Sequence, residues 1–332
     1  MTSSPAPTRQ EFTVAENAGD TVLAALRKHL PGNLSWSAVR KLLQGRRVTI
    51  GGVLCLDEDR RLTIGETVAV AQRPVPPPPT DADVNIRYAD HDVLIVEKPS
   101  GMVTLRRKSE YAWPLSRRMQ QPTLDECVPR LLREHAARRN RSEKIHQRMP
   151  RLFSVHRIDR DTSGLLVFAR TEDAQQKLIA QFAAHKAVRK YFALVPGTPA
   201  DQTIETNLVR DRGDGLRGSS ANETGQQAIT HIRLLRKIGA FSELECSLET
   251  GRTNQIRIHL AEIGHPVCGD LKYRGPLSNP NISDDSQAPR LCLHAAELRL
   301  QHPSTDEVLH FTTPWPQQMQ HYLNRLAVRK DS

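Results

Sequence analysis

The side chains best suited to chemistry lie in one charge-dense stretch, residues 154–169. It has the sequence SVHRIDRDTSGLLVFA and passes from a polar turn into a strongly apolar segment. A buried strand at 165–169 would hold the preceding turn rigidly at a sheet edge, where Asp159 or Asp161 can serve as a positioned carboxylate. The simplest alternative is that both carboxylates only build Asx turns around Gly164.

Other chemistries could also use this stretch. His156, Asp159 and Asp161 would suit a metal-dependent phosphodiester hydrolase, but no second cluster of ligands appears in the sequence. His-Arg followed by Asp also occurs in protein-kinase catalytic loops, but no glycine-rich phosphate loop accompanies it here. The sequence has neither a GxxxxGK[ST] loop nor an HExxH or CxxC pair, so neither a nucleotide cofactor nor a metal is expected.

The charge of the chain is concentrated in one region. The net charge is +10, and residues 104–151 hold 13 Lys and Arg against 5 Asp and Glu. Such charge, interspersed with Tyr111, Trp113 and His146, would attract a phosphate backbone, although a solvated loop is the plain alternative. No apolar run approaches the ~20 residues that span a bilayer, and no secretory leader is apparent. A cytoplasmic location is therefore expected.

The first part of the chain is expected to fold as a small unit, residues 12–72, behind a flexible leader at residues 1–11. Apolar spacing and turn residues predict two helices and three strands. These lie at 21–30, 35–45, 46–50, 53–56 and 67–71. Gly51 and Gly52 would form the hairpin turn, because both of its central residues need a positive φ.

This order of elements resembles the S4-type RNA-binding module. The resemblance rests on the stretch SWSAVRKLLQGRRVTIGG and the later IGETVAV. It implies that the unit binds RNA through cations at Arg40, Lys41, Arg46 and Arg47. Charged residues on an exposed helix often serve solubility alone, which is the alternative.

A proline-rich segment at residues 73–82 is expected to form a semi-rigid linker, since proline cannot donate to a sheet and favours an extended conformation. Residues 83–327 should then form one α+β domain, because strands and helices do not alternate regularly. The strands are expected at 93–96, 165–169, 191–195, 229–235 and 243–248, and the helices at 123–137 and 171–185.

Four motifs of this larger domain resemble, in order, those of the RluA-type RNA pseudouridine synthases. HRIDRDTSG at 156–164 resembles the family signature HR-L-D-x-x-TSG. The other three are VLIVEKPSG at 93–101, VRKYFALVPG at 188–197 and LETGRTNQIRIH at 248–259, with the turn GHPVCGD at 264–270 following. The resemblance covers residues 84–320. It implies the pseudouridine-synthase fold, a mixed and largely antiparallel sheet with flanking helices.

The resemblance also implies an activity and its residues. Asp159 maps onto the indispensable catalytic carboxylate and Arg157 onto the arginine that helps to displace the target base. Tyr191 maps onto the active-site tyrosine, and Arg257 onto the arginine that pairs with the carboxylate. The chain would then isomerise uridine in RNA without a cofactor. Large-subunit ribosomal RNA is the first expected target, because S4-bearing relatives commonly act there, and transfer RNA is the second.

This sequence departs from the family pattern at a few places. Asn254 stands where histidine is more usual, and Arg189 where lysine is common. Two basic stretches, residues 105–121 and 138–148, look like insertions that bear on the choice of RNA. The main rival is a catalytically silent RNA-binding or ribosome-assembly protein that kept the fold. A monomer is the default expectation.

Overall fold

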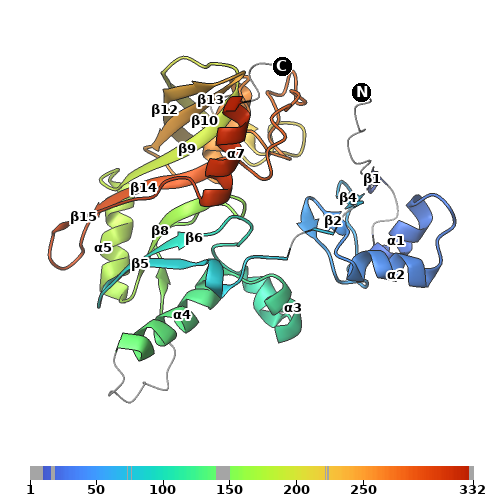
Figure 1. The fold of residues 1–332 in the computed structure, drawn as a ribbon, viewed down its shortest axis with the longest axis horizontal. Coiled ribbons are helices and arrows are strands. Elements are labelled where there is room, and N and C mark those ends of the chain that lie inside the picture. The colour runs from blue at the N-terminus through green and yellow to red at the C-terminus, as the bar shows by residue number, and fades with distance from the viewer. Residues whose placement is uncertain are drawn as a thin grey trace. The chain divides into compact units, whose positions relative to one another are not determined.

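The chain folds as two compact units, Met1–Pro77 and Pro78–Ser332 (Figure 1). The computed structural model describes residues 10–15, 19–72, 74–75, 77–139, 150–220, 222 and 224–328. Each unit has its own sheet and its own hydrophobic core. These are the N-terminal unit and the C-terminal unit.

The N-terminal unit packs two helices, α1 (Val22–His29) and α2 (Trp36–Gln44), with a four-stranded antiparallel sheet. Thr21 and Ser35 cap the helices, because their side-chain oxygens accept from the backbone N–H three residues on. The sheet order is β1-β4-β2-β3, with β1 Gln10–Thr13, β4 Thr67–Val70, β2 Val48–Ile50 and β3 Val53–Leu54. The φ angles of Gly51 and Gly52 are 55° and 76°, which confirms the hairpin turn.

Strand β1 corrects one expectation. It begins at Gln10, which pairs with Val70 of β4, so the leader predicted at residues 1–11 reaches two residues too far. The strand has the sequence QEFT, and three of its four residues are exposed. Backbone pairing at a sheet edge does not require apolar side chains, so hydrophobic patterning gives no signal for it.

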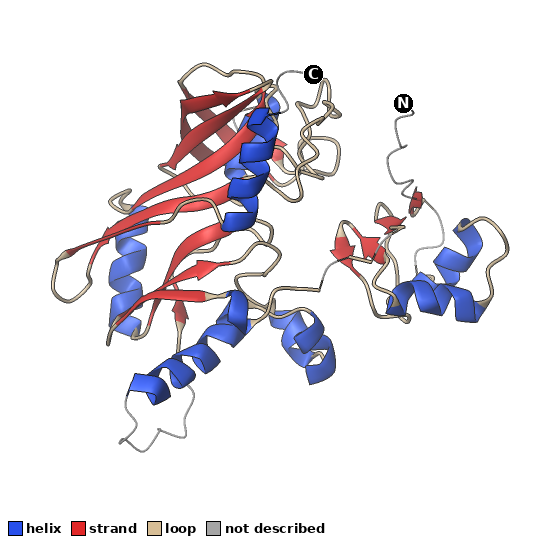
Figure 2. Ribbon diagram, viewed as in Figure 1, coloured by secondary structure: helices blue, strands red, loops and turns tan. Residues whose placement is uncertain are grey.

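One mixed sheet of 11 strands forms the frame of the C-terminal unit (Figure 2). Nine strands follow in the order β11-β10-β12-β13-β9-β14-β8-β6-β5, while β15 pairs with β14 and β7 with β8. The pairs are antiparallel except β14 with β8, which is parallel. The largely antiparallel mixed sheet expected from the sequence is therefore confirmed. The strands are β5 Asn85–Ala89, β6 Val93–Lys98, β7 Phe153–Ser154, β8 Ser163–Ala169, β9 Val188–Pro196, β10 Gln202–Val209, β11 Gly218–Ser219, β12 Gln226–Ile238, β13 Phe241–Leu248, β14 Leu293–Gln301 and β15 Val308–Thr312.

Helices cover both faces of the sheet around β6 and β8. Successive residues of these strands alternate between two cores, as the period of two requires. Leu166 and Phe168 pack with α4 residues such as Val128, whereas Leu165 and Val167 pack with α5 residues such as Leu178. The helices are α3 Leu115–Gln120, α4 Leu124–Arg139, α5 Glu172–Ala183, α6 Gln255–Glu262 and α7 Gln317–Val328, with 3-10 turns η1 Asp81–Asp83 and η2 Lys108–Ala112. Strand β8 is buried along its whole length.

The expected strands correspond to β6, β8, β9, β12 and β13, and the expected helices to α4 and α5. Helix α6 was not predicted. Every residue from Gln255 to Ala261 is buried, so the helix has no polar face to give it a helical periodicity. Helix α7 was also missed, although its buried residues Met319, Tyr322, Leu323 and Leu326 have helical spacing.

Gly164 at the start of β8 is required by the parallel pairing with β14. It lies opposite Ala295 and has a φ of 114°. A Cβ atom at this position would lie 2.2 Å from the carbonyl oxygen and 2.7 Å from the nitrogen of Ala295. Only glycine lets the two backbones approach this closely.

Gly164→Ala should lower the free energy of unfolding by about 3 kcal/mol or more, because backbone strain and a steric clash each cost about 1–3 kcal/mol. Gly213→Ala is the matched control. Its φ is 115°, but a Cβ atom added there would have no neighbour within 4 Å. Urea unfolding measures the free energy of unfolding of both variants. Gly213→Ala reports the backbone strain alone, and Gly164→Ala reports the strain together with the clash. Equal losses would mean that the contact with Ala295 does not constrain this position.

Candidate active site

Arg257 joins two carboxylates that are far apart in the sequence. From helix α6, its Nε and Nη2 donate to the two oxygens of Asp270 at 2.7 and 2.8 Å. Its Nη1 lies 3.6 Å from Oδ2 of Asp159, in the loop before β8. The planar guanidinium can satisfy both acids at once because its donors point in different directions. The pairing of Asp159 with Arg257 expected from the sequence is present.

Asp270 was not among the predicted site residues. Its side chain is fully buried. Besides Arg257, its Oδ1 accepts hydrogen bonds from the backbone N–H groups of Lys272 and Tyr273 at 2.8 and 3.0 Å. Its position at the end of the GHPVCGD turn was the available signal. Asp270 fixes the orientation in which Arg257 faces Asp159.

Asn254 performs a comparable function beside Arg257. Its Oδ1 accepts from Arg257 Nη1 at 3.0 Å, and its Nδ2 donates to the hydroxyl of Tyr273 at 3.1 Å. Its φ of 61° is left-handed, a conformation that asparagine tolerates better than most residues. Asparagine at this position therefore keeps a polar link between Arg257 and the buried Tyr273.

Burial and nearby cations act in opposite directions on Asp159. Its side chain is 20% exposed. Burial raises the pKa of this carboxyl above its ordinary value, while the positive charges of Arg257, Arg157 and Lys98 act to lower it. Burial disfavours the charged form of Arg257, but the carboxylates of Asp270 and Asp159 outweigh this and raise its pKa. Arg257 is therefore charged at any pH relevant to the protein.

Tyr191 lies in the same row of the sheet as Gly164. Both residues are in register with Ala295, from the two sides of β14. Tyr191 is 6% exposed, and burial raises the pKa of its phenol, as does the charge of Asp159, while Arg189 acts in the opposite direction. The phenol therefore keeps its proton near neutral pH.

Arg157 differs from the other charged residues of the motif in being exposed. No described residue of the chain forms a hydrogen bond or a salt bridge with its side chain. Its positive charge nevertheless acts to lower the pKa of Asp159, two residues further along the same loop. The side chain is thus available to a bound molecule.

His156 has a structural environment. Its Nε2 accepts a hydrogen bond from the backbone N–H of Val167 at 3.1 Å, and its ring stacks on Phe182 with centroids 4.6 Å apart. Burial lowers the pKa of His156 to about 3, so the ring is neutral. Asp161 is held by Arg160 at 2.8 Å. Within the described ranges, no group of three or more His, Cys, Asp or Glu residues could hold a metal ion.

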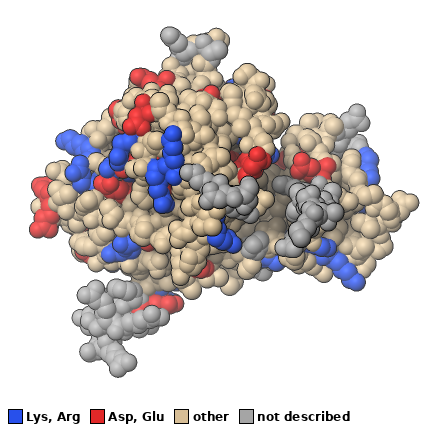
Figure 3. All heavy atoms as spheres, turned by 45° about the horizontal axis from the view of Figure 1, so that its top comes forward, with Lys and Arg blue, Asp and Glu red and all other residues tan. Residues whose placement is uncertain are grey.

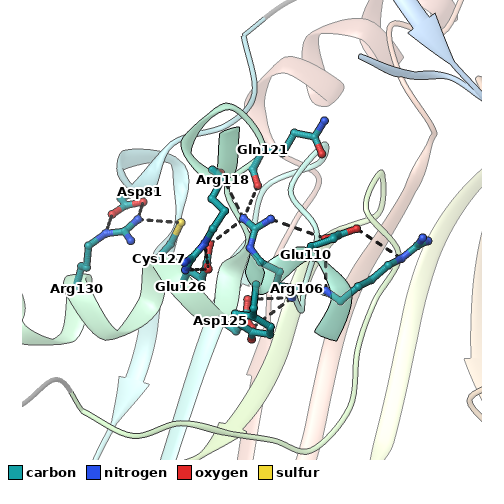
Figure 4. A network of polar contacts seen from close by, with 11 residues as sticks. Asp81, Arg106, Glu110, Arg118, Gln121, Asp125, Glu126, Cys127 and Arg130 are labelled. Atoms are coloured by element: carbon teal, nitrogen blue, oxygen red, sulfur yellow. Dashed lines mark hydrogen bonds and ion pairs between the residues drawn. The ribbon is translucent and has the colours of Figure 1, made fainter. Parts of the chain in front are cut away.

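The first basic stretch, residues 105–121, is folded onto helix α4 (Figure 4). The guanidinium of Arg106 donates to the carbonyl of Gln121 and to the carboxylate of Glu126, both at 2.8 Å. Arg118 also binds Glu126, and Asp125 accepts from the hydroxyl of Tyr111. Several cations of this stretch are therefore paired inside the protein. Most of the second stretch, at 138–148, lies outside the described residues.

Positive charges elsewhere are also interspersed with negative ones. On the face drawn in Figure 3, Lys and Arg side chains alternate with Asp and Glu instead of forming one continuous basic field.

The four cations predicted in the N-terminal unit differ in their contacts. Arg40 pairs with Glu58 at 2.5 Å. Arg46 donates to the carbonyl of Val75 at 3.0 Å, and Arg47 to that of Gln72. Lys41 is exposed. Arg46 and Arg47 directly precede β2, so their hydrogen bonds connect the hairpin of β2 and β3 to the segment that follows β4.

A feature of the N-terminal unit that the sequence did not reveal is a shallow hollow of about 350 Å³ between the two helices. It is lined by Ala24, Arg27, Lys28, Asn33 and Trp36. The guanidinium of Arg27 lies 4.5 Å from the ring centroid of Trp36, and Trp36 is 45% exposed. Exposed indole and clustered cations are typical of surfaces that contact nucleic acid.

Comparison with known proteins defines the class. The profile of the RNA pseudouridylate synthase family matches residues 92–262. Ribosomal large subunit pseudouridine synthase D of Neisseria meningitidis is 32% identical over 325 residues, 94% of this chain and 80% of that protein. An uncharacterised RNA pseudouridine synthase of Bacillus subtilis is 36% identical over 246 residues, 74% of this chain and 73% of that protein.

Solved structures agree on the fold. Human RNA pseudouridylate synthase domain containing 4 superposes with a TM-score of 0.55 at 23% identity, covering 73% of this chain and 92% of that one. Human RNA pseudouridylate synthase domain containing 1 superposes with a TM-score of 0.52 at 25% identity, covering 72% of this chain and 86% of that one. The chain belongs to the RNA pseudouridylate synthase family. It is an RNA-modifying isomerase of the RluA type, as its motifs predicted.

No helix among the described residues is long and apolar enough to cross a membrane.

The buried carboxyl predicts a pH dependence. If the reaction uses Asp159 in its ionised form, kcat/KM should fall on acidification through an apparent pKa above 3.8, the ordinary aspartate value, because burial favours the protonated form. Arg257→Gln removes a charge that lowers this pKa, so its acid limb should move to higher pH. Arg233→Gln, an exposed arginine paired with Glu245, is the control. An unmoved limb in Arg257→Gln would contradict the electrostatic link.

Proposed function

We propose that this chain converts uridine to pseudouridine with Asp159 as the catalytic carboxylate, assisted by Tyr191 and Arg257. The observation that carries the proposal is the largely buried Asp159 carboxylate, 3.6 Å from an Arg257 whose orientation Asp270 fixes. A positioned carboxylate beside a permanent cation can stay ionised while shielded from water. A silent RNA-binding protein would have no use for this arrangement.

The chemistry requires only such a carboxylate. The reaction breaks the bond from N1 to C1′ and forms a bond from C5 to C1′, while the hydrogen of C5 is lost and N1 gains a proton. No electrons enter or leave, so no redox cofactor is required. Asp159 either attacks C1′ as a nucleophile or removes a ribose proton to give a glycal. Tyr191 offers a ring to stack on uracil and a hydroxyl for proton movement at C5.

Arg157 is proposed to displace the target base. A uridine inside a stacked helix must leave its stack before its ribose can reach Asp159, which costs a few kcal/mol. The Arg157 side chain is exposed, has no hydrogen-bond or salt-bridge partner among the described residues, and lies two residues before the proposed catalytic Asp159, so it can occupy the vacated space.

The proposed substrate is large-subunit ribosomal RNA, with transfer RNA as the second candidate. Several relatives that align with most of this chain carry the name ribosomal large subunit pseudouridine synthase D. We further propose that residues 10–72, which include strand β1, are an S4-like RNA-binding unit and residues 83–327 the catalytic domain, acting as a cytoplasmic monomer. Lys41 and the hollow at Trp36 are the strongest candidates for RNA contact in the first unit, followed by Arg40, Arg46 and Arg47.

The test of the proposal is Asp159→Asn, assayed by tritium release from RNA carrying uridine labelled at C5. Turnover should fall by more than about 1,000-fold, because loss of a nucleophile or base removes the chemical step itself. RNA binding should stay within a few-fold, measured by filter binding. Asp161→Asn, which alters the neighbouring carboxylate, is the matched control and should keep most activity.

Ribosomal and transfer RNA substrates are assayed in parallel, with EDTA present. Tritium release from ribosomal RNA only would support ribosomal RNA as the target. Tritium release from transfer RNA only would make transfer RNA the target instead. Near-normal turnover by Asp159→Asn would remove Asp159 from the chemical step.

Arg157→Ala tests base displacement. Its kcat/KM should fall about ten-fold further on a structured stem than on a flexible strand, equivalent to about 1.4 kcal/mol of the unstacking cost. The comparison uses two RNAs with the same target sequence, one paired and one unpaired. Equal losses on both would count against this role for Arg157.

A further inference from the structure

One neighbouring segment, residues 98–104, holds the backbone of the loop that carries Asp159. Each backbone carbonyl from residue 158 to residue 161 accepts a hydrogen bond, and all but that of Asp159 accept it from this segment. The donors are Thr104 Oγ1 to Ile158 at 2.7 Å, Gly101 N to Arg160 at 2.8 Å, Lys98 Nζ to Arg160 at 2.9 Å and Ser100 Oγ to Asp161 at 2.6 Å. The Asp159 carbonyl accepts from Thr162 N at 3.2 Å.

The bond from Thr104 acts on the peptide group directly before Asp159. It reaches the carbonyl of the peptide bond that joins Ile158 to Asp159. Because a peptide group is planar, fixing its oxygen also fixes the direction of the bond from the Asp159 nitrogen to its Cα. Thr104 is 2% exposed and Ile158 is 5% exposed, so water has little access to replace the hydroxyl.

Thr104 is itself held firmly by helix α4. The carbonyl of Val103 accepts from Leu124 N at 2.8 Å, and that of Thr104 accepts from Asp125 N at 3.1 Å. These two donors belong to the first turn of the helix, where backbone N–H groups lack partners within the helix. The backbone of Thr104 is therefore held rigidly against α4, and the hydrogen bond from its hydroxyl fixes the loop of Asp159 relative to this helix.

We propose that Thr104 is a positioning residue for catalysis, whose hydroxyl orients the peptide before Asp159 and so aims the carboxylate at the target ribose. The inference rests on the proposed catalytic role of Asp159. Without the hydroxyl, a buried carbonyl has no partner, and the loop gains by rotating toward another donor. Such a rotation would alter the 3.6 Å separation between Asp159 and Arg257.

The experiment compares Thr104→Val with Thr123→Val in the full chain. Both replacements exchange a buried hydroxyl for a methyl group of similar size. Thr123 Oγ1, however, is buried with no hydrogen-bond partner among the described residues, and the residue is 1% exposed. Thr104→Val should lower kcat about 10- to 100-fold with little change in KM, the scale expected when a reacting group is displaced by about 1 Å. Thr123→Val should retain activity within two-fold of wild type, because the hydroxyl that it removes makes no hydrogen bond to the described residues and the side chain keeps its size.

Two further readouts separate positioning from general stability. The acid limb of the pH profile should shift in Thr104→Val, because the surroundings of Asp159 change, whereas a loss through partial unfolding would leave the limb in place. Thr104→Ser keeps the hydroxyl and should restore most of kcat, while Thr104→Ala should not. The serine and alanine variants differ by one oxygen atom, so comparing their kcat values tests the role of the hydroxyl even where Thr104→Val does not fold.

The outcomes are distinct from those of the proposed function. A Thr104→Val enzyme as active as Thr123→Val, or an equal loss in the serine and alanine variants, would overturn the inference while leaving Asp159 in its role. An active Asp159→Asn enzyme would overturn the proposed function itself, whatever Thr104 does.

Discussion

The burial of a negative charge at Asp159 is the constraint to which the rest of the C-terminal unit is adapted. A carboxylate removed from water is costly unless an opposite charge and polar groups surround it. Arg257 supplies the charge, but a guanidinium near a buried acid is itself costly to desolvate. Asp270 compensates for that cost with two hydrogen bonds to Arg257 and accepts two more from backbone N–H groups. The result is a chain of alternating charges in which each member stabilises the next.

The sheet provides the rigidity that this chain of charges needs. Strand β8 is buried on both faces, so the loop before it has a fixed end. The parallel pairing with β14 places Gly164 against Ala295, and the antiparallel pairing on the other side of β14 brings Tyr191 into the same row. Because strand register is set over many residues, a local change cannot easily shift one of these positions alone.

Part of the positive charge of this protein is used to stabilise its own fold. Arg106 and Arg118 belong to the most basic region of the sequence, yet both are bound to Glu126. Their pairing folds residues 105–121 onto helix α4, so part of the local positive charge stabilises the protein. The exposed Arg157 and the hollow at Trp36 are better placed to meet RNA, because their side chains remain accessible.

The sequence by itself determined the class of the protein and the position of Asp159 before a buried strand, and it predicted the pairing of Arg257 with Asp159. These signals are local, since a motif and its following strand occupy adjacent residues. The helices and hairpin of the N-terminal unit were also predictable, because caps, turn glycines and apolar spacing act over a few residues. Helix α6 was not, since burial on all sides removes the pattern that marks a helix.

Only the tertiary structure decided which groups hold the site in place. Thr104 bonds to Ile158 across 54 residues, and Asp270 bonds to Arg257 across 13. Many threonines and aspartates in the chain could have filled these positions as far as their chemistry is concerned. The choice among them depends on strand register and helix placement, which arise from the packing of the whole unit. Hydrogen bonds are short and directional, so residues far apart in sequence become partners only where that packing brings them together.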